Sequence, residues 1–294
     1  RPQPAAARRG GRRARWRMGR GGAAAERASL ECGFVAGLAV TALLHPWDRA
    51  LYLSVINATP FFVAENWRQP YRGLSQTLVG RSFSSGIYFP LEDACGELLG
   101  SRCLGGQAAG VLSGAVLNPL SLIKYQSWGS KEGVSFAKTA SQLYRDAGPS
   151  AFLRGALTTA CRDAIFGLCF SLRGRFQTGT DHSRDFAVAM LCAAAGTTLS
   201  SPFNYLRNRL YAEGPRAELG SARARREFLR QALEELAAGA RGQRTPAAGL
   251  QYVQGRLRLG WGTARVGVGM ALADQVYTAC GRLERAAAAC SEGR

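Results

Sequence analysis

Three arginines stand inside otherwise apolar runs of this chain of 294 residues. Arg81, Arg162 and Arg265 each lie in the first third of a run of spanning length, and Asp163 directly follows Arg162. A guanidinium in such a run is costly to bury, so it normally faces a water-filled cavity and marks a pathway. Guanidinium groups bind carboxylates bidentately and aspartate binds ammonium groups, so these residues suit recognition of a charged solute. The alternative for the Arg162–Asp163 doublet is a local ion pair.

Other kinds of site chemistry find no support in the sequence. The eight cysteines form no CxxC pair, which argues against zinc or thioredoxin-type chemistry. His45 and His182 are too few and too far apart for a metal site or a Ser–His relay. The glycine-rich "LGWGTARVGVG" lacks the strand and the Lys-Ser/Thr ending of a phosphate loop, so helix packing is the better interpretation. We expect no enzyme, no cofactor and no metal.

The chain begins with a strongly basic segment. Its first seventeen residues carry seven arginines and no acid, within a total net charge of +18, and Met18 is the first methionine. We interpret 1–28 as a disordered or targeting segment, or as a fragment boundary or upstream translated sequence. A nucleic-acid partner is disfavoured, because the arginine-rich stretch has one aromatic residue and no fold motif. The remainder is still basic, which favours anionic lipids and solutes.

A small-residue pair recurs three times at a fixed distance from a proline. Pro46, Pro119 and Pro202 each end an apolar window, and small residues stand thirteen and nine positions before each of them. Small residues allow close helix contacts in a bilayer, and proline kinks a helix. The pairs are Gly33 and Gly37, Gly106 and Gly110, and Ala189 and Ala193.

Each of these windows is followed by a second apolar run. The six resulting runs predict spanning helices near 30–57, 73–98, 104–128, 154–176, 184–212 and 256–284. Between the members of a pair lie amphipathic stretches such as "VSFAKTASQLYRDAG" and "ARARREFLRQALEELAAG". We expect these to be helices lying in the membrane interface, and the alternative is an amphipathic helix packed on a core.

The chain resembles the mitochondrial carrier family in this threefold pattern. The family's signature is Pro-x-Asp/Glu-x-x-Lys/Arg at the end of each odd helix, followed by an aromatic-basic-Gly turn. Its turn is matched by "YRG" at residues 71–73 and, within "DAGPSAFLRGALTTACRD", by Leu153-Arg154-Gly155, whereas Arg258 stands where a third glycine is expected. The resemblance implies an all-α membrane protein of six transmembrane helices in three two-helix pseudo-repeats around a central cavity, with short amphipathic helices on the matrix side. The predicted repeats are 29–101, 102–180 and 181–294.

The resemblance also implies a matrix-side gate, in which the acid of one repeat pairs with the base of the next. Asp48 is then expected to form a full ion pair with Lys124. Ser121 can only hydrogen-bond Arg207. The implied gate residues are Pro46, Asp48, Pro119, Ser121, Lys124, Pro202, Asn204 and Arg207.

The third gate contact lacks both charges, because Asn204 faces Leu51 at the base position. One ion pair in a partly wet mouth contributes about 1 kcal/mol, and one hydrogen bond contributes about as much. The sequence therefore predicts a gate that opens easily, or a protein that no longer cycles.

The family's substrate contact lies seven residues after the glycine of the even helix. From Gly155 this position is Arg162, and Arg81 and Arg265 fall at or next to the same place in the other repeats. With Asp163, the cavity would carry a net charge of about +2 and suit an amino acid or a carboxylate. Cardiolipin is the lipid that the resemblance implies at the helix N-termini, bound by Arg72, Gly73, Arg154 and Gly155.

The sequence thus predicts a monomeric, multi-pass antiporter of the inner mitochondrial membrane that moves a small anionic or zwitterionic metabolite. Alternatives are a non-transporting carrier-like scaffold with a degenerate gate and a soluble basic nucleic-acid-binding protein.

Overall fold

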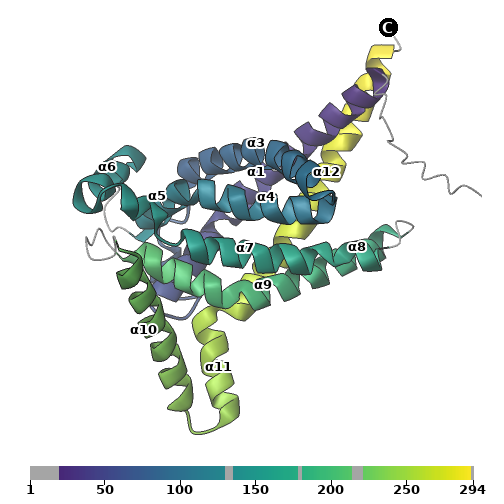
Figure 1. Cartoon of the computed structure of the whole chain (residues 1–294). Coiled ribbons are helices and arrows are strands. Elements are labelled where there is room, and N and C mark those ends of the chain that lie inside the picture. Colours follow the sequence, from purple (N-terminus) through teal and green to yellow (C-terminus); the bar gives the residue numbers. More distant parts are fainter. Residues whose placement is uncertain (1–19, 130–134, 178–180, 214–220, 293–294) are drawn as a thin grey trace, which may run out of the picture.

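Every regular element that the computed structural model describes is a helix (Figure 1). The described residues are 20–129, 135–177, 181–213 and 221–292, and they contain no strand. The helical class that the sequence predicts is therefore confirmed. The elements are α1 (Arg20–Ile56), α2 (Ala64–Trp67), α3 (Leu74–Leu99), α4 (Arg102–Val116), α5 (Asn118–Gly129), α6 (Phe136–Ala147), the 3-10 helix η1 (Pro149–Leu153), α7 (Ala156–Ser171), α8 (Arg173–Phe176), α9 (His182–Ala212), α10 (Ala222–Arg241), α11 (Pro246–Leu257) and α12 (Leu259–Glu292).

The run 104–128 is not one continuous helix, which is a correction to the prediction. It breaks between α4 and α5, and the two parts are bent by 56°. Pro119 has no N–H to continue the helical ladder. The side chain of the preceding Asn118 donates to the carbonyls of Phe152 and Arg154, each at 2.8 Å, which holds the bend. The helices α1 and α9 continue through Pro46 and Pro202.

Six helices form a closed ring. In sequence order α1 packs against α3, α3 against α4, α4 against α7, α7 against α9 and α9 against α12, and α12 returns to α1. Figure 1 shows α1 and α12 side by side although they are the first and last helices of the chain. Such a ring has an outer surface and an interior, and both matter for function.

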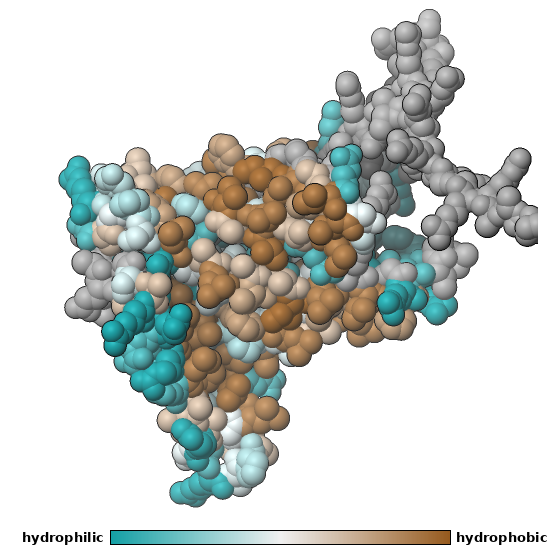
Figure 2. All heavy atoms as spheres, in the orientation of Figure 1, coloured by the Kyte–Doolittle hydropathy of each residue, from teal (hydrophilic) through white to brown (hydrophobic). Residues whose placement is uncertain are grey.

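The outer surface of the ring is apolar over much of its height. Figure 2 shows a brown, hydrophobic area over α3, α4, α7 and α9, with hydrophilic residues gathered at the ends. A patch of this kind on a helical protein marks a contact with lipid or with another protein. By length and composition, α9 is long and apolar enough to cross a membrane, and α4 with α5 would be a second if the bent pair is one span. Exposed apolar residues on α3, α4, α7 and α9 include Val79, Leu112, Leu157, Leu168, Leu191 and Leu199.

The amphipathic stretches are helices, as predicted, and they pack on the core. In α6, Leu143 is buried against Leu122, Ile123 and Tyr211. The packed-helix alternative from the sequence therefore describes α6.

The second amphipathic helix, α10, is packed in the same manner. Its Ala232 is buried in a cluster with Val55 and Leu206. On its outer face Arg230 donates to Glu227 at 2.6 Å, and this hydrogen bond lowers the pKa of Glu227 below its usual 4.5. In Figure 1, α10 forms an antiparallel hairpin with α11, which the sequence did not predict.

Three corresponding turns precede α3, α7 and α12, and all three have left-handed backbone. The φ angles are 76° at Gly73, 73° at Gly155 and 55° at Arg258. A Cβ at Gly73 would lie 2.8 Å from Trp128 Nε1, and one at Gly155 would lie 2.7 Å from Tyr211 Cε1. Both glycines are therefore required for the close approach as well as for the φ angle.

Arg258 takes the left-handed position without being glycine. Its guanidinium donates to the carbonyls of Ser54 and Thr59, at the end of α1 and just beyond it. These hydrogen bonds offset the strain of a left-handed non-glycine residue, which is of order 1–2 kcal/mol. The turn that departs from the family pattern in sequence thus keeps the backbone conformation.

Candidate functional site

The interior of the helical ring holds a charged cavity. Two adjoining pockets, of about 310 and 500 Å³, share seven lining residues. The smaller pocket, which Lys124 also lines, has five cationic and two acidic side chains and so a net charge of +3. All four predicted substrate contacts lie here. The seven shared residues are Asp48, Arg81, Tyr125, Arg162, Asp163, Arg207 and Arg265.

The strongest contact across the cavity joins α1 to α12. Arg265 donates through Nε to one carboxylate oxygen of Asp48 at 2.5 Å and through Nη2 to the other at 2.6 Å. The side chains retain 25% and 30% of their exposure, so the pair lies on the cavity wall and not inside the packing. This is the bidentate geometry by which arginine recognises a carboxylate.

The expected Asp48–Lys124 ion pair is not formed in this structure, which is a correction. The ammonium group of Lys124 lies over the rings of Tyr125 and Trp128, at 4.4 and 4.8 Å from their centroids. Asp48 prefers the planar fork of Arg265 because two parallel hydrogen bonds fix it there, whereas an ammonium group is a point charge. Both partners of the expected pair nevertheless line the same pocket.

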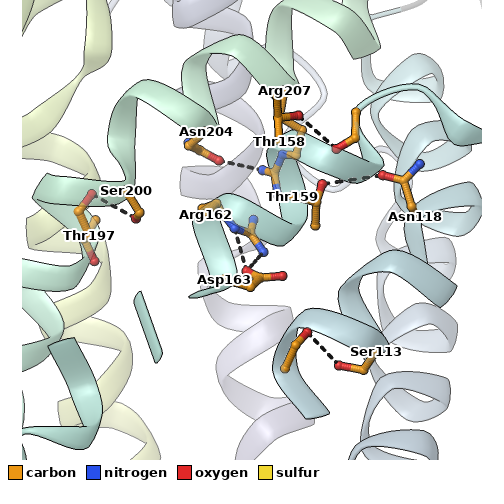
Figure 3. A network of polar contacts seen from close by, with 12 residues as sticks. Ser113, Asn118, Thr158, Thr159, Arg162, Asp163, Thr197, Ser200, Asn204 and Arg207 are labelled. Atoms are coloured by element: carbon orange, nitrogen blue, oxygen red, sulfur yellow. Dashed lines mark hydrogen bonds and ion pairs between the residues drawn. The ribbon is translucent and has the colours of Figure 1, made fainter. Parts of the chain in front are cut away.

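Arg207 is also held by partners other than the expected one. Its Nη2 donates to Asn204 at 2.7 Å, to Asn208 at 3.3 Å and to the Tyr125 hydroxyl at 3.3 Å (Figure 3 shows the Asn204 bond). Ser121 lines the same pocket, but the hydrogen bonds described for Arg207 do not include it. The partner at Asn204 is three residues away on the same helix, so local geometry decides this contact.

The doublet on α7 forms a local ion pair. Arg162 donates to Asp163 Oδ1 through Nε at 2.7 Å and also through Nη2 (Figure 3). This is the second of the two possibilities that the sequence leaves open, and it neutralises both groups in this state. Arg81, by contrast, lines both pockets without a hydrogen bond or an ion pair among the described residues, and it approaches the position of a Cβ on Gly37 to 3.6 Å.

Four aromatic side chains form a layer at the proline-bearing end of the cavity, and we call them the aromatic floor: Tyr52, Tyr125, Trp128 and Tyr211. Tyr125 is central, with ring centroids 4.6 Å from Tyr52, 5.0 Å from Trp128 and 5.3 Å from Tyr211. Tyr52 and Tyr125 line both the 500 Å³ pocket and a further pocket of about 770 Å³, so the floor separates the two.

Sequence reasoning missed the aromatic floor, although a signal was present. Tyr52 and Tyr125 each stand six residues after a proline, and Trp128 and Tyr211 each stand nine after one. Burial of Tyr52, Trp128 and Tyr211 at no more than 2% exposure shows that the floor is closed here.

The predicted lipid contacts are placed differently in the two glycine turns. Arg72 is partly buried, and its carbonyl accepts a hydrogen bond of 2.9 Å from Nε2 of the buried His45. Arg154 is fully buried and donates to the carbonyl of Glu213 at 3.3 Å. Its side chain therefore points into the protein, and the backbone at Gly155 is the part of this turn that remains for an anion.

The described helices form a ring around a central cationic cavity. Residues 96–178 match the family model described as mitochondrial carrier protein. The match runs from the end of α3 to just beyond α8, so the chain is similar to mitochondrial carriers over this segment. No curated protein matches the chain.

Proposed function

We propose that this chain is an antiporter of the inner mitochondrial membrane that moves a small carboxylate or amino acid by alternating access. Its transport unit would be a monomer of six transmembrane helices in three two-helix repeats, with bound cardiolipin. The observation that supports the proposal most directly is the net charge of +3 around the smaller pocket inside the helical ring. A low-dielectric wall focuses the field of such a cluster and concentrates anions within it.

The ion pairs inside the cavity favour an anionic solute over a neutral zwitterion. Asp163 is the acid that an ammonium group would need, and it is already held by Arg162. Arg81, Lys124 and Arg207 have no carboxylate partner in the described part of the chain, so the uncompensated charge is cationic. A dicarboxylate or an acidic amino acid fits this balance better than a neutral zwitterion.

The test is counter-exchange in liposomes that contain the purified protein and cardiolipin. Labelled succinate, L-glutamate, L-alanine and phosphate would be offered in turn. Arg81→Ala is expected to lower uptake of the accepted solute at least tenfold, because it removes a cavity cation that has no protein partner. Arg230→Ala removes the same charge from the exposed face of α10 and should leave uptake unchanged. Failure of all four solutes to exchange would refute the proposal.

A carrier-like scaffold that does not transport is the second candidate. The observation that favours it is the set of uncharged residues Leu51, Ser121 and Asn204 at three of the six gate positions. A scaffold would show no solute-dependent rise in melting temperature, whereas a specific rise together with counter-exchange would exclude it. Extraction at high pH separates both from a soluble nucleic-acid-binding protein, since only the latter would leave the membrane.

A further inference from the structure

The central cavity already contains a carboxylate in the position that a bound solute would take. Asp48 holds both Nε and Nη2 of Arg265, at 2.5 and 2.6 Å, and α1 and α12 contribute one partner each. A free carboxylate would approach a guanidinium through the same two hydrogen bonds. A solute can therefore bind Arg265 in this way only after Asp48 has left it.

A second cation is available to Asp48 in the same pocket. Lys124 lines this pocket and lies over the rings of Tyr125 and Trp128, with no acidic partner among the described residues. Asp48 lies on the ring helix α1, and Lys124 lies on α5, which follows the ring helix α4 after the bend. An Asp48–Lys124 pair would thus draw these helices together beside the aromatic floor.

We infer that Asp48 is an internal competitor for the substrate: the solute's carboxylate displaces it from Arg265, and the released Asp48 then pairs with Lys124 and tightens the floor. This inference rests on the proposed function and names the substrate class as a carboxylate. A neutral solute cannot break the Asp48–Arg265 pair, because it offers no charge in exchange. A dicarboxylate gains a further cation in Arg81, which lines both adjoining pockets.

The Arg162–Asp163 pair is a different arrangement. Its two members are adjacent on one helix, so displacing Asp163 would rearrange only α7. The Asp48–Arg265 pair joins two helices, so its exchange is the one that can link solute binding to helix movement.

The decisive experiment measures succinate binding to Asp48→Asn in detergent together with succinate uptake in liposomes. Succinate is expected to bind about tenfold more tightly than to the wild type, because its competitor is gone, while uptake falls at least tenfold. Lys124→Gln should lower uptake to a similar extent without tightening binding, because Arg265 stays occupied. Asp48→Ser serves as the second variant if Asp48→Asn does not purify as a folded protein.

A double-mutant cycle distinguishes competition from a general change of charge. In an Arg265→Gln background, Asp48→Asn should no longer tighten succinate binding, because the contested guanidinium is absent. Tightening of equal size in both backgrounds would show that Asp48 acts only through the field of the cavity, and would overturn the inference.

The failure of the inference and that of the proposed function have different signatures. If the wild type takes up succinate or L-glutamate but Asp48→Asn does not bind succinate more tightly, the inference is overturned and the proposed function stands. Uptake of phosphate but of no carboxylate overturns both the inference and the substrate class of the proposed function, and leaves only the transport activity. A wild-type protein that neither binds nor exchanges any of these solutes overturns the proposed function, and the inference with it.

Discussion

Replacing Asn118 by alanine should destabilise the protein, because the buried side chain of this residue joins distant segments of the chain. Asn118 is 1% exposed and ties three elements to α5. Its Nδ2 donates to the carbonyls of Phe152 and Arg154, each at 2.8 Å, and its Oδ1 accepts from the Tyr211 hydroxyl at 2.6 Å. The Tyr211 hydroxyl would keep only a 3.3 Å contact with Thr159 after the substitution.

The size of the effect follows from these three hydrogen bonds. Each contributes about 1 kcal/mol net, so Asn118→Ala should lower the free energy of unfolding by about 3 kcal/mol. For a chain of this size, about 2 °C of melting temperature corresponds to each kcal/mol, so the expected fall is about 6 °C. Thermal unfolding of the detergent-solubilised protein, followed by tryptophan fluorescence, would measure it.

Two further variants make the prediction specific. Asn57→Ala removes an exposed amide and should shift the melting temperature by less than about 1 °C. Tyr211→Phe combined with Asn118→Ala should show a coupling free energy of about 1 kcal/mol, because both single changes remove the same hydrogen bond. Equal melting temperatures for Asn118→Ala and Asn57→Ala would show that the bend between α4 and α5 does not depend on this amide.

Three other predictions concern a turn, the gate and a surface helix. Gly155→Ala should lower the free energy of unfolding by about 2 kcal/mol or more, because its Cβ would collide with a ring and φ is 73°, as a denaturation curve would show. Leu51→Lys with Asn204→Asp, which share a pocket, should add about 1 kcal/mol of stability and slow counter-exchange. Arg230→Gln should raise the pKa of Glu227 in an NMR titration.

Each of the three has a control or a contrary outcome. Gly110→Ala should be tolerated, since nothing lies within 4 Å of its Cβ. Unchanged stability and exchange in the Leu51–Asn204 double variant would show that the cyclic register of the gate is wrong. For Glu227 the lowered pKa means that its contribution to stability is present above pH 4.5 and is lost as the pH falls through its folded-state pKa. An unaltered titration in Arg230→Gln would contradict the hydrogen bond as the cause.

The positions of the long helices could be predicted from the sequence because each of them coincides with a long apolar run. A kink at Pro119 could be predicted from the proline, but its angle of 56° could not, since Asn118 is held by the carbonyls of Phe152 and Arg154, more than thirty residues away. Similarly, α11 was not predicted as a separate helix, because its sequence has little apolar periodicity. Contacts between distant segments decide both features, and a pattern within a window of sequence does not contain them.

In the candidate site, too, the residues could be predicted from the sequence but their partners could not. Residue types identified Arg81, Arg162 and Arg265 as cavity cations, and the structure places all three in the cavity. Their partners could not be predicted, because Asp48 and Arg265 are 217 residues apart and the choice between Arg265 and Lys124 depends on how the ring closes. The contacts of Arg207 with Asn204 and Asn208 are local, so helical spacing alone could have suggested them.

The left-handed turn at Arg258 has a mechanical consequence. Its guanidinium donates hydrogen bonds to the carbonyls of Ser54 and Thr59, and these bonds join the start of α12 to the end of α1. The turn at Gly73 is joined to α1 through the bond of His45 to the Arg72 carbonyl, and the turn at Gly155 is joined to α5 through Asn118. The start of α12 should therefore follow the end of α1 whenever the ring rearranges.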